Sequence, residues 1–501
     1  MSADPKKFYF NRRMVLAGLF SSAASVVLAK APKRSVRPEP RPQAIKLLAA
    51  GSVEDIVKSA KLDGKVGFMV ADAATGEILE SYKPLLGLPP ASVTKAITTI
   101  YSLDALGSAH KFNTQLVATG PIENGRLSGD LYLVGGGDPT LDTDALGELA
   151  RDLKDAGVRE ITGKAYVHSG ALPYQKSIDP GQPEHLGYNP SLSGLNLNYN
   201  RVFFEWKRLA EGYSITMDAR ALKFRPRVAM SSIKVVDRSS PIFSIKSTST
   251  TDQWTVSKRA LGKKGGRWLP VRRPEFYAAE VFHTIARSFG IQLPAFTAAK
   301  SRPTGTVIAQ WQSAKLGVML RRMMKHSTNL TAEAVGVTAS RKRGGSPAKL
   351  KDSGRMMAAW LKTRTGAKHA KFVDHSGLGD GSRISASDMT KVLVKQGWGG
   401  PLRQLMKDIP LRDTNGKPVK NHPVKVRAKT GTLNFVSALA GYIEAPKGRR
   451  LVFAVFSADL PRRVKITKAN KERPKGARGW NRRSKIMQQQ LIERWVTAFD
   501  G

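Results

Sequence analysis

The chain has 501 residues, of which 82 are Lys or Arg, 39 are Asp or Glu and none is Cys, so its formal net charge is +43. This length and an apolar content of 41% predict a folded protein of several domains and exclude bulk disorder. The absence of Cys excludes disulfides, thiolate metal sites and a thiol nucleophile. After the N-terminus the sequence has no apolar run long enough to cross a membrane, which excludes a protein with several membrane spans. The charge indicates that some partner is anionic.

The N-terminal residues have the pattern of an export signal. A basic stretch that ends in Arg12-Arg13 precedes an apolar stretch of mostly small residues, and this order is typical of a signal peptide. We therefore expect residues 1–29 to be a signal of the twin-arginine or the general secretory type, and the protein to reach the periplasm. Residues 30–43, rich in Pro and basic residues, predict an extended linker. Loss of residues 1–29 leaves a net charge of +40, so the charge belongs to the folded body.

Residues 44–111 predict the first part of a domain that contains both helix and strand. The apolar run Val66–Val70 and the Thr75-Gly76 turn that follows it predict a β-hairpin. Apolar residues at helical spacing then predict a helix from Val93 to Leu106, which a glycine ends.

The middle of the chain predicts two inserted domains. Residues 112–205 and 273–305 show short strands and two helical patterns, and we assign them to one inserted domain. Residues 206–272 show short β-like alternations and hold 15 Lys or Arg against 4 Asp or Glu. This change in composition predicts a separate, basic and β-rich inserted domain.

Residues 306–501 predict the second part of the domain that begins at residue 44. Residues 424–429 alternate apolar and basic and predict a strand. The runs Ser437–Glu444 and Leu451–Ser457 predict two paired strands, and residues 486–499 predict a final helix.

Ser92-Val93-Thr94-Lys95 is the first candidate for chemistry. At the start of a helix, residues three apart lie on one face, so the hydroxyl of Ser92 and the amine of Lys95 can meet. A serine hydroxyl needs an adjacent base to act as a nucleophile, and a lysine can be that base only where burial or a nearby positive charge lowers its pKa. The same spacing occurs at Ser231/Lys234 without supporting features, so this motif alone is not specific.

Ser327-Thr328-Asn329 is the second candidate and follows a helix predicted from the apolar stripe Leu316–Met323. A hydroxyl and an amide two residues apart on a loop can relay a proton and hold a substrate amide. The structural alternative is that Ser327 and Asn329 only cap the next helix, which would start near Thr331.

Lys429-Thr430-Gly431-Thr432 is the third candidate and ends the alternating strand. Lys429 and Gly431 share one face of this strand, and Thr430 lies on the other. The glycine allows a ligand to approach the backbone, the strand edge can pair with an extended peptide, and Lys429 can bind a carboxylate. The structural alternative is a solvated basic strand face that Lys429 shares with its neighbours Lys425 and Arg427.

In this order, the three motifs resemble the signature set of penicillin-binding proteins and serine β-lactamases. The separation of Lys95 and Ser327 by 232 residues resembles the D-Ala-D-Ala carboxypeptidase/endopeptidase family, the dacB-type, class C low-molecular-mass penicillin-binding proteins of peptidase family S13. The stretches 133–140, 195–200 and 374–378 are similar to that family too. One departure is Thr328, where many relatives carry Asp at a position that is not expected to do chemistry.

The resemblance, which covers residues 45–500, implies an α+β fold with a penicillin-binding/β-lactamase-like transpeptidase domain. In this fold an antiparallel sheet is flanked by helices, and two β-containing domains are inserted into the chain. Residues 44–111 and 306–501 would together form the transpeptidase domain.

The resemblance also implies a serine DD-peptidase that cleaves D-Ala-D-Ala, or the D-Ala–diaminopimelate cross-link, through an acyl-enzyme. Ser92 would be the nucleophile and Lys95 its general base. Ser327 would pass the proton to the leaving amine, and Asn329 would bind the amide on the acyl side.

The third motif would hold the other end of the substrate. Lys429 and Thr430 would bind the terminal carboxylate, and Gly431 would let the substrate lie against the strand. The backbone N–H groups of Ser92 and Thr432 would form the oxyanion hole. No cofactor and no metal are implied.

The implied partners are peptidoglycan stem peptides as substrates and β-lactam antibiotics as covalent inhibitors. The basic segments 206–272 and 462–485 would meet an anionic wall polymer or a membrane surface, rather than nucleic acid, for which the chain has no motif. Two alternatives stay open, a serine β-lactamase and a non-catalytic, basic wall-binding protein on the same fold. The sequence also leaves open the choice between carboxypeptidase and endopeptidase activity and the oligomeric state.

Overall fold

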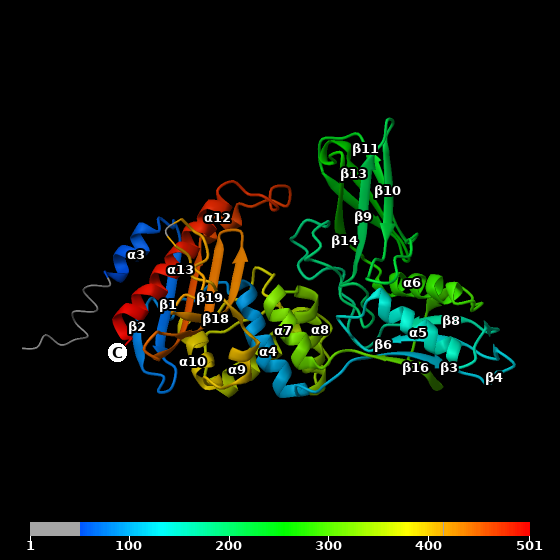
Figure 1. Ribbon diagram of the computed structural model, residues 1–501, viewed down its shortest axis with the longest axis horizontal. Helices are drawn as coiled ribbons and strands as arrows, with labels where there is room; N and C mark the ends of the chain where they lie inside the picture. Colours follow the sequence, from blue (N-terminus) through cyan, green and yellow to red (C-terminus); the bar gives the residue numbers. More distant parts are fainter. Residues whose placement is uncertain (1–50, 414, 501) are drawn as a thin grey trace, which may run out of the picture.

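Both ends of the chain contribute strands to one six-stranded antiparallel sheet, which has the order β17-β18-β19-β20-β1-β2 (Figure 1). This computed structural model describes residues 51–413 and 415–500, and the expected signal peptide and linker lie outside the described residues. β1 (Lys65–Asp72) and β2 (Ile78–Tyr82) form the predicted hairpin. β1 also pairs along its whole length with β20 (Arg450–Ala458), so the sheet joins the two ends of the described chain.

The central strands of this sheet are mostly apolar on both sides, and both of their faces are buried. In β20, Phe453 and Val455 pack with α13 (Ala477–Phe499), whereas Ala454 and Phe456 join the core on the opposite face. The same alternation continues into β19 (Val436–Glu444), the next strand of the sheet. The short helix α3 (Val53–Ser59) packs beside α13.

A layer of helices covers the opposite face of the sheet (Figure 1). Its central member is α4 (Thr94–Leu106), whose residues 94–102 are all buried because other helices and the sheet surround it. The other members are α7 (Leu316–His326), α8 (Asn329–Lys342), α9 (Leu350–Thr365), α10 (Ala386–Gln396) and α11 (Pro401–Leu405). The predicted α+β fold with a helix-flanked antiparallel sheet is therefore confirmed.

The chain leaves this layer after α4 and returns to it at α7, and the residues between them form a second lobe (Figure 1). Its five-stranded sheet has the order β15-β8-β6-β3-β16 and packs against α5 (Thr143–Asp155) and α6 (Pro274–Ser288). The strands are β3 (Asn113–Ala118), β6 (Leu131–Gly135), β8 (Ala165–His168), β15 (Phe296–Ala298) and β16 (Thr306–Gln312). Short strands β4 (Ile122–Glu123), β5 (Arg126–Leu127) and β7 (Glu160–Ile161) form a small separate sheet.

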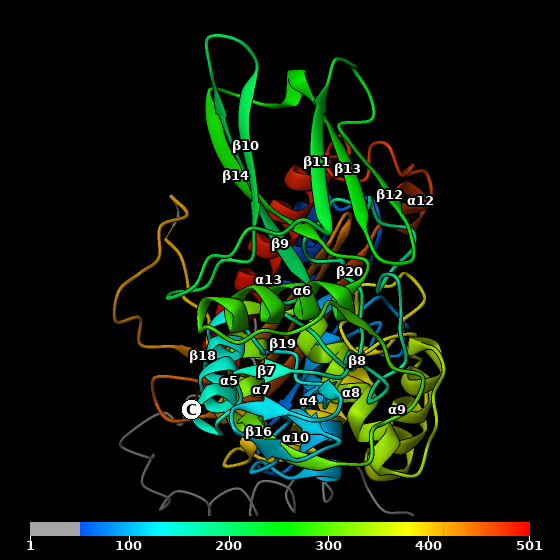
Figure 2. The same cartoon turned by 90° about the vertical axis from the view of Figure 1, so that its right-hand side faces the viewer.

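The segment predicted to be β-rich forms two three-stranded sheets that project from the second lobe (Figures 1 and 2). One sheet has the order β10-β9-β14 and the other β11-β13-β12. The strands are β9 (Arg201–Arg208), β10 (Tyr213–Asp218), β11 (Ser231–Val236), β12 (Phe243–Ser247), β13 (Asp252–Ser257) and β14 (Lys264–Pro270).

Three predicted boundaries differ from the structure. The limit between residues 205 and 206 falls inside β9, since the change in charge begins after the strand has started. The limit between residues 305 and 306 falls before β16, which pairs with β3 and so belongs to the inserted lobe. The final helix begins at Ala477 rather than at residue 486, because its first turns are basic and mask the apolar pattern. Among the described helices, none is long and apolar enough to cross a bilayer.

Candidate active site

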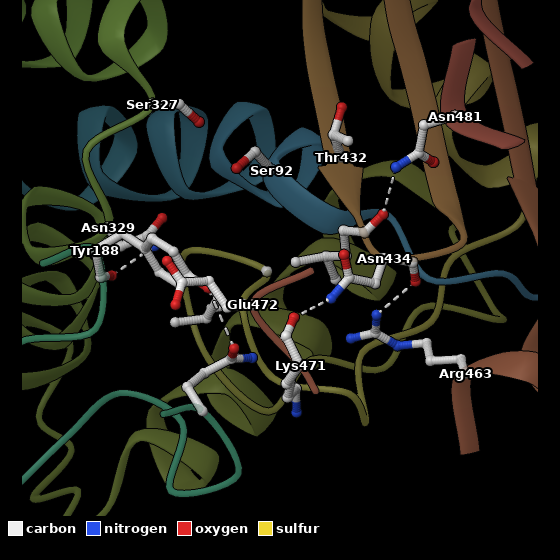
Figure 3. Close-up of a pocket in the computed structure, with 14 residues that line it drawn as sticks. Ser92, Tyr188, Ser327, Asn329, Thr432, Asn434, Arg463, Lys471, Glu472 and Asn481 are labelled. Atoms are coloured by element: carbon white, nitrogen blue, oxygen red, sulfur yellow. Dashed lines mark hydrogen bonds between the residues drawn. The ribbon is translucent and has the colours of Figure 1, made fainter. Parts of the chain in front are cut away.

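The three motifs meet at one cavity of about 270 Å³ between the helical layer, the edge of the sheet and the inserted lobe (Figure 3). Ser92 comes from η2 (Ala91–Val93), the single 3₁₀ turn that leads into α4. Ser327 and Asn329 come from the junction of α7 and α8, and Thr432 comes from β18 (Lys425–Leu433). Ser92 and Ser327 point toward one another across the cavity (Figure 3).

Two glycines allow the backbone to come close to the nucleophile. A Cβ atom on Gly431 would lie 2.5 Å from the carbonyl oxygen of Pro90 and 3.1 Å from the backbone nitrogen of Ser92. A Cβ atom on Gly377 would lie 1.8 Å from the carbonyl oxygen of Ala91, and Gly377 itself has a φ of 75°. Only glycine fits at either position without moving the backbone.

Lys95 lies fully buried beneath Ser92. Its Nζ atom donates to Asn329 Oδ1 at 2.7 Å and to the carbonyl oxygen of Ser376 at 2.8 Å, and it lies 3.0 Å from Ser92 Oγ, with which it also forms a hydrogen bond. Burial lowers the pKa of Lys95 to about 8, although the carboxylates of Glu333 and Asp374 oppose this shift. A fraction of Lys95 is therefore uncharged at neutral pH.

The partners of Lys95 fix the direction of its lone pair. The amide oxygen of Asn329 and the carbonyl of Ser376 can only accept hydrogen bonds, so each must receive an N–H from Lys95. A neutral amine has two N–H groups, and both are then used. The remaining lone pair faces Ser92 Oγ, which is the arrangement that a general base requires.

Lys429 and Ser327 form a second hydrogen-bonded pair, of which Ser327 lines the cavity. Ser327 ends α7 with a left-handed φ of 58°, and its Oγ accepts a hydrogen bond from Lys429 Nζ at 3.1 Å. Lys429 also donates to the carbonyl of Thr430 at 2.7 Å and is only 1% exposed. The alternative of a solvated basic strand face is therefore wrong for Lys429. Burial, and then the charges of Lys95 and Lys407, hold its pKa well below the usual value.

Asn329 is the first residue of α8, and its side chain contacts both parts of the molecule. Its Oδ1 accepts from Lys95, and its Nδ2 donates to the carbonyl oxygen of Tyr188 in the inserted lobe at 2.9 Å. One N–H of this amide is left to face the cavity. The alternative that Ser327 and Asn329 only cap a helix starting near Thr331 is wrong, because α8 begins at Asn329 and both side chains bind lysines.

The two threonines of the third motif differ in position. Thr432 lines the cavity, whereas Thr430 is not among the lining residues that the structure describes. The close approach of Gly431 to Ser92 brings the backbone of β18 alongside the nucleophile.

Three buried residues of the site were not predicted from the sequence as functional. Glu333 and Asp374 are both fully buried carboxylates, and Ser376 supplies the carbonyl that binds Lys95. A weak signal existed for Glu333, which is the single charged residue in the otherwise uncharged stretch 330–337. Its position one helical turn after Asn329 places it toward the same side of α8.

The inserted lobe and the C-terminal basic segment close the outer side of the cavity. Gln182 and Tyr188 line it from the inserted lobe, and Arg463, Lys471 and Glu472 line it from the other side (Figure 3). Glu472 Oε2 lies 3.0 Å from His185 Nε2, so this segment also contacts the inserted lobe. Two basic residues of the segment 462–485 thus belong to the cavity wall.

Residues 51–413 and 415–500 hold no group of three His, Cys, Asp or Glu side chains placed to bind a metal ion.

Comparison with known proteins gives a consistent result. Residues 49–478 match the D-Ala-D-Ala carboxypeptidase 3 (S13) family. The chain is 28% identical over 449 residues to a D-alanyl-D-alanine carboxypeptidase of Actinomadura sp. (strain R39), which covers 81% of this chain and 80% of the relative. It is 24% identical over 431 residues to the D-alanyl-D-alanine carboxypeptidase DacB of Haemophilus influenzae, covering 81% of this chain and 88% of that relative.

The fold is similar to a solved structure as well. The crystal structure of penicillin binding protein 4 (dacB) from Haemophilus influenzae superposes with a TM-score of 0.71 at 20% identity, over 89% of this chain and 99% of that one. The same protein complexed with a β-lactam superposes with a TM-score of 0.68 at 21% identity, over 89% of this chain and 99% of that one. Both likenesses concern the whole architecture, including the inserted lobe.

Proposed function

The chain belongs to the D-Ala-D-Ala carboxypeptidase 3 (S13) family and is a serine DD-peptidase of peptidoglycan, and we propose that Ser92 is its nucleophile and Lys95 its general base. The observation that carries this assignment is the contact of 3.0 Å between Ser92 Oγ and Lys95 Nζ, whose other two partners can only accept hydrogen bonds. No other base is needed to activate the hydroxyl.

The proposed reaction begins when Lys95 takes the hydroxyl proton of Ser92 as Oγ attacks the carbonyl carbon of the penultimate D-Ala. The backbone N–H groups of Ser92 and Thr432 stabilise the oxyanion, and one such donor contributes about 3–4 kcal/mol in comparable sites. The C–N bond then breaks, and Ser327 relays to the leaving amine the proton that Lys95 took from Ser92. Water then attacks the carbonyl of the acyl-enzyme while Lys95 takes one of its protons, the ester C–O bond breaks, and Lys95 returns the proton to Ser92 Oγ.

Lys429 and Thr430 are proposed to hold the terminal carboxylate of the substrate, although Thr430 does not itself line the cavity, because it shares its face of β18 with Thr432, which does. Burial lowers the pKa of Lys429, and a bound carboxylate would raise it because the opposite charge favours the ammonium form. The free N–H of Asn329 is proposed to bind the amide on the acyl side, which would place this part of the peptide beside Tyr188.

The test of this assignment is labelling with a fluorescent penicillin. The wild type should be labelled, Ser92→Ala should lose labelling completely, and Ser102→Ala should keep it. Ser102 is a buried serine of the same helix whose Oγ bonds only to backbone carbonyls of that helix, so it is a matched control. A wild type that is never labelled would contradict the assignment, and rapid turnover of the penicillin would indicate a β-lactamase instead.

Digestion of purified peptidoglycan distinguishes the two possible DD-peptidase activities. Mass spectrometry should show release of single D-Ala from a carboxypeptidase, or cleavage of cross-linked dimers by an endopeptidase. Both products should be absent with Ser92→Ala, since both reactions pass through the same acyl-enzyme.

We also propose that the protein is exported to the periplasm and that its basic surface holds it on an anionic wall polymer or membrane surface. The exposed position of most basic residues in segment 206–272 supports this proposal. They are Lys207, Arg208, Lys223, Arg225, Arg227, Lys234, Lys246, Lys258, Arg259, Lys263 and Lys264. A surface of one charge sign raises the local concentration of an oppositely charged polymer.

A further inference from the structure

A buried carboxylate lies in the wall of the site, behind Lys95, and takes no part in the proposed reaction. We infer that Glu333 is a positioning residue, which holds the Ser376 carbonyl against Lys95 and thereby aims the lysine at Ser92. This inference rests on the proposed role of Lys95 as the general base.

The contacts form a continuous chain from Glu333 to the nucleophile. Glu333 Oε1 accepts from the backbone nitrogen of Ser376 at 2.9 Å, and Oε2 accepts from that of His375 at 3.0 Å. The carbonyl of Ser376 then accepts from Lys95 Nζ at 2.8 Å. Lys95 reaches Ser92 Oγ at 3.0 Å, so the carboxylate acts three contacts away from the reacting hydroxyl.

The turn that carries Ser376 is fixed at its other end as well. Asp374 accepts from the backbone nitrogens of Gly377 at 2.8 Å and Gly379 at 2.6 Å. The Ser376 carbonyl belongs to the same peptide unit as the Gly377 N–H that Asp374 holds, and Glu333 fixes the peptide unit immediately before it, so both carboxylates orient this carbonyl. If this carbonyl moved away, Lys95 would lose one of its two acceptors, and its lone pair would no longer be directed at Ser92.

The charges around Lys95 predict how a change at Glu333 alters the reaction. The groups that face Lys95 are Glu333 from α8, Asp374 from the turn and Lys429 from β18. His375, in the same turn, stays neutral because burial lowers its pKa to about 3. Burial and the nearby carboxylate of Asp374 raise the pKa of Glu333 to about 8, so its charge is present from the pH range in which Lys95 titrates upward. In that range Glu333 and Asp374 both favour the charged amine, so removal of the Glu333 charge should lower the pKa of Lys95 further.

The test is the pH dependence of the second-order rate constant for acylation by a fluorescent penicillin, measured from about pH 5 to about pH 10. For Glu333→Gln we expect the maximal rate to fall at least about tenfold, because the amide replaces one of the two accepting oxygens with an NH₂ group that can only donate. We expect the midpoint of the acidic limb to move down by about one pH unit, because the uncharged amine is favoured. For Glu333→Asp, which keeps the charge, the midpoint should stay near that of the wild type.

Asp252→Asn is the matched control for the loss of a buried carboxylate. Asp252 accepts from the backbone nitrogen of Arg272 at 2.6 Å in the inserted lobe and has no contact with the site. This variant should leave both the midpoint and the maximal rate unchanged.

A midpoint for Glu333→Gln that equals the wild-type value, or one that moves to higher pH, would overturn the inference. The second outcome would mean that Glu333 only packs the site and that its loss admits water to Lys95. Labelling of the wild type together with loss of labelling in Ser92→Ala keeps the proposed function intact in either case, so the two failures are distinguishable.

Discussion

Two residues next to the site adopt a backbone conformation that side chains disfavour. Ala91, which precedes the nucleophile, has a φ of 46°, and Ser327 has a φ of 58°. Such conformations cost about 1–3 kcal/mol each and persist where the surrounding structure fixes them. Gly377 helps to fix the conformation of Ala91, because its lack of a side chain lets the turn 374–379 lie against the carbonyl of Ala91.

Gly377→Ala should therefore destabilise the protein and slow acylation together. The new Cβ would lie 1.8 Å from the carbonyl oxygen of Ala91, so either the turn or the nucleophile must move. We expect a loss of more than about 1 kcal/mol of the free energy of unfolding, measured by chemical denaturation. Gly399→Ala is the control, because no atom lies within 4 Å of its added Cβ. Equal stability and equal labelling rates in the two variants would show that the close approach is unimportant.

At this scale the sequence predicted the side chains of the three motifs but not the groups that orient them. Ser92 and Lys95 lie three residues apart, and Lys429 and Thr432 share one strand, so local spacing is informative. The contact of Glu333 with the backbone of Ser376 joins distant segments through a main-chain atom, and no residue type marks such a partner. The burial of Lys429 was also unpredictable, since its strand neighbours are exposed or half-buried basic residues.

Helix α13 is the element that covers the face of the sheet opposite the active site. Its buried side chains, which include Leu491 and Trp495, pack on β1 and β20. The sequence predicted its apolar second half but not its basic first half, where Trp480 is nevertheless fully buried. The periodic spacing of apolar residues, by which a helix is predicted, is hard to recognise in a sequence where the helix has a long basic face and few apolar residues.

Leu491→Ala should lower stability without altering the site. Leu491 is 0% exposed, and the truncation should cost about 2–5 kcal/mol of the free energy of unfolding, measured by denaturant titration. Ile486→Ala, on the same helix and 49% exposed, is the control and should cost less than about 0.5 kcal/mol. At denaturant concentrations below the unfolding transition, penicillin should label Leu491→Ala and Ile486→Ala equally. A large loss of labelling in Leu491→Ala would contradict the view that this residue serves stability and not the active site.

For the whole molecule, the excess of basic residues is distributed over both lobes. The segment 462–485 has exposed members and also members that build the cavity wall, and Trp480 is too buried to stack with a base. The composition predicted the sign of the charge and the segments that carry it. It could not predict which residues face solvent, because that depends on the packing of segments distant in the sequence.

Removal of four charges at a time should test the proposed binding of the basic surface to the cell wall. Glutamine at Lys258, Arg259, Lys263 and Lys264, all exposed in the β-rich segment, should weaken binding to insoluble peptidoglycan and reduce its salt dependence. The same change at Lys465, Lys468, Lys475 and Arg478 should do so as well. The control is an equal change at Lys351, Lys362, Lys368 and Lys371, also exposed. If all three variants sediment with the wall as the wild type does, specific basic clusters are not what holds the protein there.

The pairing of β1 with β20 has a consequence for how the enzyme folds during its synthesis. Lys65 pairs with Ala458, about 390 positions later, and Ser92 lies just beyond the hairpin that this pairing anchors. Contacts between such distant segments form late and make folding slow. A nascent chain therefore cannot assemble the site until its last strands have been synthesised, however early Ser92 and Lys95 are made. The order of strands in the sheet delays the first turnover until the polypeptide is nearly complete.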